Sequence, residues 1–175
     1  MKLIKSYKQI STKKGDKGTS TNYSNEEFSK SDVLFDTLGT IDELSSMLGV
    51  VYHYTKLQDE IRYIQTKLQD INSLVATTNE EIKAKLIGVS IKDIEKLEEF
   101  EKRILEDCSI EPVFVLPGSD STKESAYFDL SRSIARRAER RLVSFVNYYQ
   151  RDDLIDSMRF LNRLSDLLFI IARSL

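Results

Sequence analysis

Apolar residues recur at intervals of three or four over most of this 175-residue chain, and this spacing constrains the fold more than any other feature. A period near 3.6 places apolar side chains on one face of an α-helix, whereas a half-buried strand would show strict alternation. The pattern predicts five amphipathic helices, at residues 32–51, 57–75, 90–104, 121–149 and 152–174. Such helices bury their apolar faces against one another, which predicts an all-α fold, a five-helix bundle.

Turn-forming residues are scarce, with 6 glycines and 2 prolines in the chain. This scarcity favours long helices over many short strands. Residues 1–31 lack helical periodicity and carry many lysines, so we expect a loop-rich basic N-terminal arm on a single domain that spans 1–175. A connector at 108–120 contains the turn signal Pro117-Gly118, and the one strand suggested by the sequence lies at 113–116.

Charge and cysteine content argue against several classes of protein. The formal net charge of -2 predicts neither a nucleic-acid-binding protein nor a membrane-surface protein. No run approaches the roughly 20 apolar residues of a transmembrane helix. Cys108 is the only cysteine, so no intrachain disulfide can form, and a reducing, cytoplasmic location is expected. Neither Cys108 nor the single histidine, His53, has neighbours that suggest catalysis or metal binding, so no metal site is predicted.

The arm contains a segment, residues 12–21, with the residue types that bind phosphate. Gly15 and Gly18 allow the backbone to turn so that successive N–H groups point into one concavity, which favours an anion. Lysines on either side and hydroxyl groups beyond them add further donors. The spacing does not match a Walker A motif. By itself, the segment is also compatible with a solvated tail that contains a turn.

The fourth predicted helix carries five arginines and one glutamate between positions 132 and 141. Arg132, Arg136 and Arg140 are spaced by four, so they form a ridge on one face of the helix. The planar guanidinium can donate two hydrogen bonds to a phosphate and stays charged, which suits a polyphosphate ligand. Glu139 lies one position from the ridge, where it could orient an arginine or contact a ribose. A solvated basic face is the alternative, although this helix segment has too few acids to pair with most of the charge.

A polar pair, Asn162 and Arg163, lies beside Leu161 and Leu164 in the last predicted helix, where core residues are expected. A buried amide needs hydrogen-bond partners, because leaving it unsatisfied costs about 1 to 3 kcal/mol. Asn162 is therefore either a structural contact between helices or a ligand contact.

Taken together, these segments resemble the PduO-type ATP:cob(I)alamin adenosyltransferases, and the similarity extends over nearly the whole chain. The motifs are Thr-Lys-Lys-Gly-Asp-Lys-Gly (12–18), Leu-Gly-Thr-Ile-Asp-Glu-Leu-Ser-Ser (38–46), Phe-Val-Leu-Pro-Gly (114–118), Arg-Arg-Ala-Glu-Arg-Arg (136–141) and Phe-Leu-Asn-Arg-Leu-Ser-Asp (160–166). Any one motif is a weak signal, whereas five in this order are specific. The resemblance implies a homotrimer of five-helix bundles with active sites between neighbouring subunits.

The resemblance also implies a set of site residues. Those expected to bind ATP from the arm are Thr12, Lys13, Lys14, Gly15, Ser20, Thr21 and Lys30. Those expected to bind it from the helices are Arg136, Arg137, Glu139, Arg140 and Asn162. Arg132 matches an arginine that pairs with an aspartate across the subunit boundary, and Asp32 is the expected partner. Phe114 matches an aromatic residue at the lower face of the corrin, where it helps to displace the lower axial ligand. A core aromatic beside a turn is the alternative for Phe114.

The reaction implied by the resemblance is attack of cob(I)alamin on the 5′ carbon of ATP, with triphosphate as the leaving group. The expected substrates are ATP with Mg2+ and cobalamin. The arginines and the loop amides would stabilise charge that develops on the leaving group. A reductase and a cobalamin-dependent enzyme would be candidate partners.

The sequence departs from the family pattern at three places. Residues 25–28 replace a usual glycine and arginine, and two extra residues lie between Pro117 and Arg132. The third departure places charged residues after the Pro-Gly turn, namely Asp120, Lys123 and Glu124.

Two other functions are compatible with parts of this pattern. Glu26 and Glu27, close to the phosphate-binding segment, favour a corrinoid- or nucleotide-binding regulator without turnover. A helical bundle with a basic RNA-binding face is the other alternative. The acidic charge balance and the lack of aromatic residues among the arginines argue against RNA binding.

Overall fold

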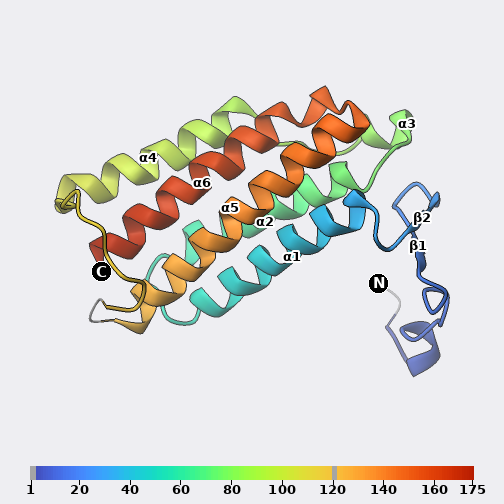
Figure 1. Ribbon diagram of the computed structural model, residues 1–175, viewed down its shortest axis with the longest axis horizontal. Coiled ribbons are helices and arrows are strands. Elements are labelled where there is room, and N and C mark those ends of the chain that lie inside the picture. The colour runs from blue at the N-terminus through green and yellow to red at the C-terminus, as the bar shows by residue number, and fades with distance from the viewer. Residues whose placement is uncertain (1–2, 120–121) are drawn as a thin grey trace.

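A computed structural model describes residues 3–119 and 122–175, in which long helices form a bundle (Figure 1). The long helices are α1 (Val33–Val51), α2 (Gln58–Val75), α4 (Ile91–Asp107), α5 (Lys123–Tyr149) and α6 (Ile155–Ser174). They confirm the predicted all-α fold and the five predicted helices, with ends that agree to within three residues. The predicted start of the fourth helix, position 121, lies outside the described residues.

Side chains at the helix starts accept hydrogen bonds from otherwise free backbone N–H groups, which explains where several helices begin. Asp32 caps α1 in this way. Ser90 and Asp93 form a reciprocal capping box at the start of α4. At the other end of α5, Gln150 has a left-handed φ of 55°, and the chain reverses there through the 3-10 turn Asp152–Leu154 (η2) into α6.

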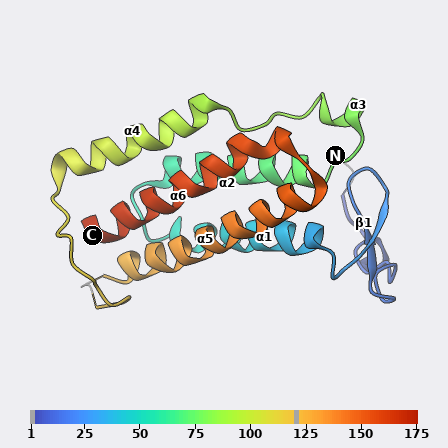
Figure 2. The same ribbon diagram turned by 45° about the horizontal axis from the view of Figure 1, so that its top comes forward.

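Neighbouring helices contact one another in the order α2, α1, α5, α6 and α4, and Figure 2 shows α4 along the outside of the bundle. The apolar faces meet in a core that includes the fully buried Phe128 and Phe160. Tyr63 on α2 donates a hydrogen bond of 2.7 Å to Asp93 on α4, and Lys67 lies 3.2 Å from the same carboxylate. Although burial opposes the change, hydrogen bonds from Ser90, Tyr63 and Lys67 lower the pKa of Asp93 to about 2. These contacts connect α2 with α4, the first and the last helix in this order.

The N-terminal arm has more regular structure than the sequence predicted. It contains the 3-10 turn Tyr7–Gln9 (η1) and an antiparallel hairpin of β1 (Thr19–Thr21) and β2 (Glu27–Ser29). Each strand is only 3 residues long, too short to show an alternating pattern. The predicted strand at 113–116 was wrong, because this segment has no partner strand in the described part of the chain.

A short helix, α3 (Glu80–Lys83), was also not predicted. It lies in the connection from α2 to α4, at the end of the bundle where the arm begins (Figure 1). None of the described helices is long and apolar enough to span a membrane.

Candidate functional site

Six of the seven residues predicted to bind nucleotide from the arm line one hollow of about 730 Å3. They are Thr12, Lys13, Lys14, Gly15, Ser20 and Thr21. The hairpin creates this hollow, since β1 carries Ser20 and Thr21 back past the 12–15 turn. Lys13 and Gly18 have φ values of 58° and 81°, so the loop uses left-handed conformations on both sides of Gly15. The hollow combines ammonium, hydroxyl and backbone N–H donors, the groups that bind phosphate oxygens.

The seventh predicted arm residue, Lys30, reaches the same loop from the end of the hairpin. A Cβ atom on Gly15 would lie 2.7 Å from Lys30 Nζ, so a larger residue here would displace the end of this lysine side chain. The backbone N–H of Lys30 donates to the Gly18 carbonyl at 2.8 Å. The fold therefore brings all seven residues to one loop.

Four further residues line the hollow that were not among the predicted site residues, namely Lys17, Thr19, Asn25 and Glu27. Glu27 lies opposite Thr21 in the hairpin register. This position depends on a strand pairing that the sequence pattern did not reveal.

Glu26, the neighbour of Glu27, is held away from the hollow. Its carboxylate accepts hydrogen bonds from Asn22, at 3.0 Å, and from Thr78 in the segment after α2. Ser24 accepts hydrogen bonds from the backbone N–H groups of Thr78 and Asn79. These contacts attach the hairpin tip to the bundle. Of the two acidic residues, only Glu27 lines the hollow, where its negative charge would repel a bound anion.

The five arginines of the α5 cluster divide into two groups. Three of them form ion pairs: Arg132 with Asp129 at 2.7 Å, Arg141 with Asp36 at 2.9 Å, and Arg137 with Glu43. Asp36 and Glu43 belong to α1, so the sequence of α5 alone overstated the unpaired charge.

Arg136 and Arg140 form the second group. Both are exposed, and neither has an ion pair among the described residues. Arg140 donates to the Arg136 carbonyl one turn earlier, at 3.0 Å. These two residues are the arginines of the cluster that remain available to an external anion.

Asn162 is exposed, although its apolar neighbours in the sequence suggested a position in the core. Its Nδ2 donates to Glu139 Oε1 at 2.9 Å, which links α6 to α5. Both residues line a shallow cavity of about 310 Å3 between α4, α5 and α6. The two predicted residues therefore lie together, and Glu139 directly precedes Arg140 in the sequence of α5.

Asp32 and Arg132 are not paired with each other within one chain. Asp32 accepts from the Leu34 N–H and from the Tyr149 hydroxyl, each at 2.8 Å, while Arg132 contacts Asp129. Their pairing between subunits stays a prediction.

Phe114 lies in the connector before α5 and is 92% exposed. The alternative of a core aromatic was therefore wrong. A fully exposed phenylalanine is available to a ligand or to another chain.

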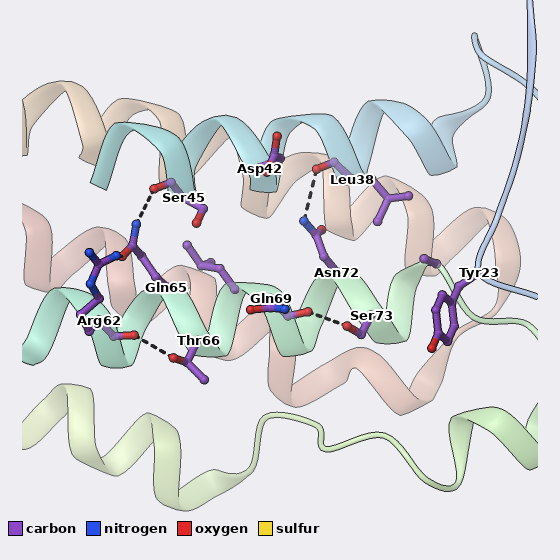
Figure 3. A pocket seen from close by; sticks show the side chains of 12 residues that line it. Tyr23, Leu38, Asp42, Ser45, Arg62, Gln65, Thr66, Gln69, Asn72 and Ser73 are labelled. Carbon is purple, nitrogen blue, oxygen red and sulfur yellow. Dashed lines mark hydrogen bonds between the residues drawn. The ribbon is translucent and has the colours of Figure 1, made fainter. Parts of the chain in front are cut away.

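The structure also contains a polar groove that sequence analysis did not find (Figure 3). It measures about 670 Å3 and lies between α1 and α2, with none of the predicted site residues in its wall. Gln65 donates to the Ser45 carbonyl at 2.9 Å across it, and Asn72 Oδ1 is buried without a hydrogen-bond partner. Polar residues on a helix surface resemble an ordinary solvated face, so no sequence pattern distinguishes this groove.

Within one chain, the predicted nucleotide-binding residues form two separate groups. The wall of the arm hollow comes only from residues 12–27, whereas the Asn162 cavity is lined by α4, α5 and α6. Figure 1 shows the arm beyond the end of α5, and Arg136 lies 13 residues, about 20 Å, from that end. No hydrogen bond or ion pair joins the two groups in the described part of the chain.

The cobalamin adenosyltransferase family model matches residues 10–175. The chain belongs to this family. It is 35% identical to the corrinoid adenosyltransferase MMAB of Bos taurus over 173 residues, which cover 94% of this chain and 70% of that protein. It is 31% identical to a corrinoid adenosyltransferase of Citrobacter freundii, covering 94% of this chain and 93% of that protein.

Solved structures show the same relationship. A variant of the PduO-type ATP:corrinoid adenosyltransferase from Lactobacillus reuteri, complexed with cobalamin and ATP, superposes with a TM-score of 0.82 at 29% identity. The match covers 94% of this chain and 92% of that one. The comparisons confirm the predicted family and the predicted class of enzyme.

Proposed function

We propose that this chain transfers the 5′-deoxyadenosyl group of ATP, bound with Mg2+, to cob(I)alamin. Membership of the cobalamin adenosyltransferase family supports the reaction class. The observation that carries the proposal is the arm hollow of about 730 Å3, which six of the predicted residues line and whose Gly15 the side chain of Lys30 reaches. The Lactobacillus reuteri relative, solved with cobalamin and ATP, supports the choice of substrates.

In the proposed reaction, the nucleophilic Co(I) attacks the ribose 5′ carbon and supplies both electrons of the new Co–C bond. The C5′–O bond breaks, and triphosphate leaves with the electron pair of that bond. The chain's own donors act on this leaving group. Lysine ammonium groups, loop N–H groups and the unpaired Arg136 and Arg140 would stabilise its growing negative charge, and they need little rearrangement to do so.

We further propose that the active site is completed in a homotrimer, by the arm of one subunit and the α5 face of its neighbour. The separation of the two groups of residues in one chain supports this arrangement. Asp32 and Arg132 would then meet across the boundary, next to the arm. The pair would add at most about 1 kcal/mol to stability if exposed. Its role would be to set the relative position of the two halves.

Phe114 is the proposed contact to the lower face of the corrin. Its exposure supports a ligand role, because the aromatic ring has no place in the core. A bulky ring there would exclude water and the dimethylbenzimidazole tail, and four-coordinate cobalt accepts an electron more readily. Phe114→Ala should slow adenosylation from cob(II)alamin much more than adenosylation from chemically prepared cob(I)alamin.

The direct test of the function is formation of adenosylcobalamin from ATP and chemically reduced cobalamin, followed by the cobalamin absorption spectrum. Triphosphate should appear in equal amount to adenosylcobalamin. ATP binding without product would instead support a nucleotide-binding regulator, the alternative that Glu27 in the arm hollow favours.

A further inference from the structure

The last residue of α5, Tyr149, contacts both ends of the segment that joins the arm to the bundle. Its hydroxyl donates to Asp32 Oδ1 at 2.8 Å. Its ring meets Phe28 edge-on, with centroids 6.5 Å apart and an interplanar angle of 83°. Phe28 and Asp32 stand on either side of Lys30. One side chain thus fixes the short stretch that carries the seventh predicted phosphate-binding residue.

The position of residues 28–32 also determines where the rest of the arm hollow lies. Phe28 pairs with Ser20 in the hairpin. Lys30 donates through its backbone to the Gly18 carbonyl at 2.8 Å, and its side chain packs against Gly15. A shift of β2 relative to α5 would therefore move the strand and the turn that line the hollow.

Tyr149 also orients the carboxylate of Asp32. Oδ1 accepts two hydrogen bonds, from Tyr149 and from the Leu34 N–H that it caps. Among the described residues, Oδ2 of Asp32 has no hydrogen-bond or ion-pair partner, so it is available to a group from outside the chain. Burial, and next the hydrogen bond to Asp32, raise the pKa of Tyr149 to about 12. The hydroxyl therefore stays protonated and able to donate at neutral pH.

The end of α5 is itself a firm support for Tyr149. The ring packs against Phe145, one turn earlier, with centroids 4.9 Å apart. Directly after the helix, Arg151 donates to the carbonyls of Leu74 and Thr77, at 3.0 and 3.1 Å, at the end of α2. It also forms an ion pair with Asp153 at 2.7 Å. These contacts attach the segment directly after Tyr149 to the bundle.

We propose that Tyr149 is a positioning residue for the nucleotide site, acting through Asp32 and Phe28 on the arm. This inference rests on the proposed function. It gives α5 two roles: the helix presents Arg136 and Arg140 directly, and through Tyr149 it sets the position of the arm.

A purely packing role would depend on the ring, whereas the positioning role depends on the hydroxyl. Tyr149→Phe separates the two, because it keeps the contacts with Phe28 and Phe145 and removes only the hydrogen bond to Asp32. Tyr148→Phe is the matched control, since it removes a hydroxyl from the neighbouring ring, which is 71% exposed.

We expect Tyr149→Phe to raise the KM for ATP about tenfold, the size that losing one hydrogen bond to a charged group produces. The KM for cobalamin and kcat at saturating ATP should change little, and Tyr148→Phe should match the wild type. The melting temperature should fall by only a few degrees, because one intramolecular hydrogen bond is lost. In an Asp32→Ala background, which has no acceptor for the hydroxyl, Tyr149→Phe should have a much smaller effect, because the two residues act as one unit.

An unchanged KM for ATP in Tyr149→Phe would overturn the inference, as would equal increases for both substrates with a lower melting temperature. A wild-type protein that forms no adenosylcobalamin would overturn the proposed function instead. In that event, ATP affinity measured by calorimetry still tests Tyr149, since the variant should bind ATP about tenfold more weakly.

Discussion

The arm hollow and the α5 arginine cluster place phosphate-binding groups on very different supports. The arm presents its donors on a loop with left-handed residues, next to a hairpin of 3-residue strands. The α5 cluster stands on a 27-residue helix whose opposite face is buried in the core. A helix fixes its side chains by its period, whereas the loop relies on a few tertiary contacts. ATP binding by the arm should therefore be sensitive to small geometric changes, whereas ATP binding by α5 should be sensitive to loss of charge.

Removing one available arginine from α5 should have the largest effect. Arg136→Ala should lower ATP affinity about 100-fold, because a charge-assisted contact to triphosphate is lost without disturbing an ion pair. Arg141→Ala is the control, since that arginine already pairs with Asp36. Calorimetry with ATP and a circular-dichroism melt check both variants. Equal ATP affinity for folded Arg136→Ala and wild type would remove α5 from the proposed site.

A change of one methyl group in the arm should have a smaller but clear effect. Gly15→Ala would place a Cβ 2.7 Å from Lys30 Nζ and displace that side chain. We expect the KM for ATP to rise about tenfold, while the melting temperature of the bundle stays the same.

Gly39→Ala in α1 is the matched control, because a Cβ there meets no atom within 4 Å. It should leave the KM unchanged and add about 0.5 to 1 kcal/mol of stability. If Gly15→Ala behaved like this control, the packing of Lys30 on the loop would have no part in ATP binding.

The contrast between loop and helix also explains how much the sequence could predict. The helices followed from apolar periodicity, because each one buries a continuous stripe such as Leu34, Ile41, Leu44 and Leu48. Apolar periodicity could not predict the ion pairs between α5 and α1, which join Arg137 to Glu43 and Arg141 to Asp36. Those contacts depend on which helices become neighbours and on how they are rotated.

In the arm, the sequence identified the residue types but not the geometry that joins them. Short motifs suggested Thr12 to Thr21 as a phosphate-binding segment. That Lys30 reaches Gly15, and that Glu26 turns toward Thr78, depends on a hairpin too short to leave a pattern. Phe114 and Asn162 were ambiguous for another reason, since an isolated phenylalanine or asparagine does not indicate whether its position is buried.

The smallest effect concerns the bundle next to Asn162. Glu101 on α4 has a buried Oε1 without a hydrogen-bond partner among the described residues, and Arg163 on α6 already pairs with Glu98 and Asp166. Burial, partly offset by Arg163 and reinforced by Asp166 and Glu98, raises the pKa of Glu101 to about 7 from its ordinary 4.5.

Because the folded state binds this proton more tightly than the unfolded state, the free energy of unfolding should fall as pH rises from about 4.5 to about 7. Glu101→Gln should stabilise the protein at pH 8 by about 1 kcal/mol, allowing for screening at a partly exposed site, and should change little at pH 4. Urea unfolding at both pH values measures this difference, with the exposed Glu95→Gln as control. A pH-independent gain would show that the charge of Glu101 is not the cause.

The central claim is that one active site uses the arm of one subunit and the α5 face of another. Mixing two inactive variants tests it most directly. Lys13→Ala/Lys14→Ala impairs every arm, and Arg136→Ala impairs every α5 face. In a trimer that contains both variants, one of the three boundaries should join an intact arm to an intact α5 face, so adenosylcobalamin formation by purified mixed trimers should recover to about a third of wild type. If co-purified mixed trimers stayed as inactive as either variant alone, both halves of the site would belong to the same chain.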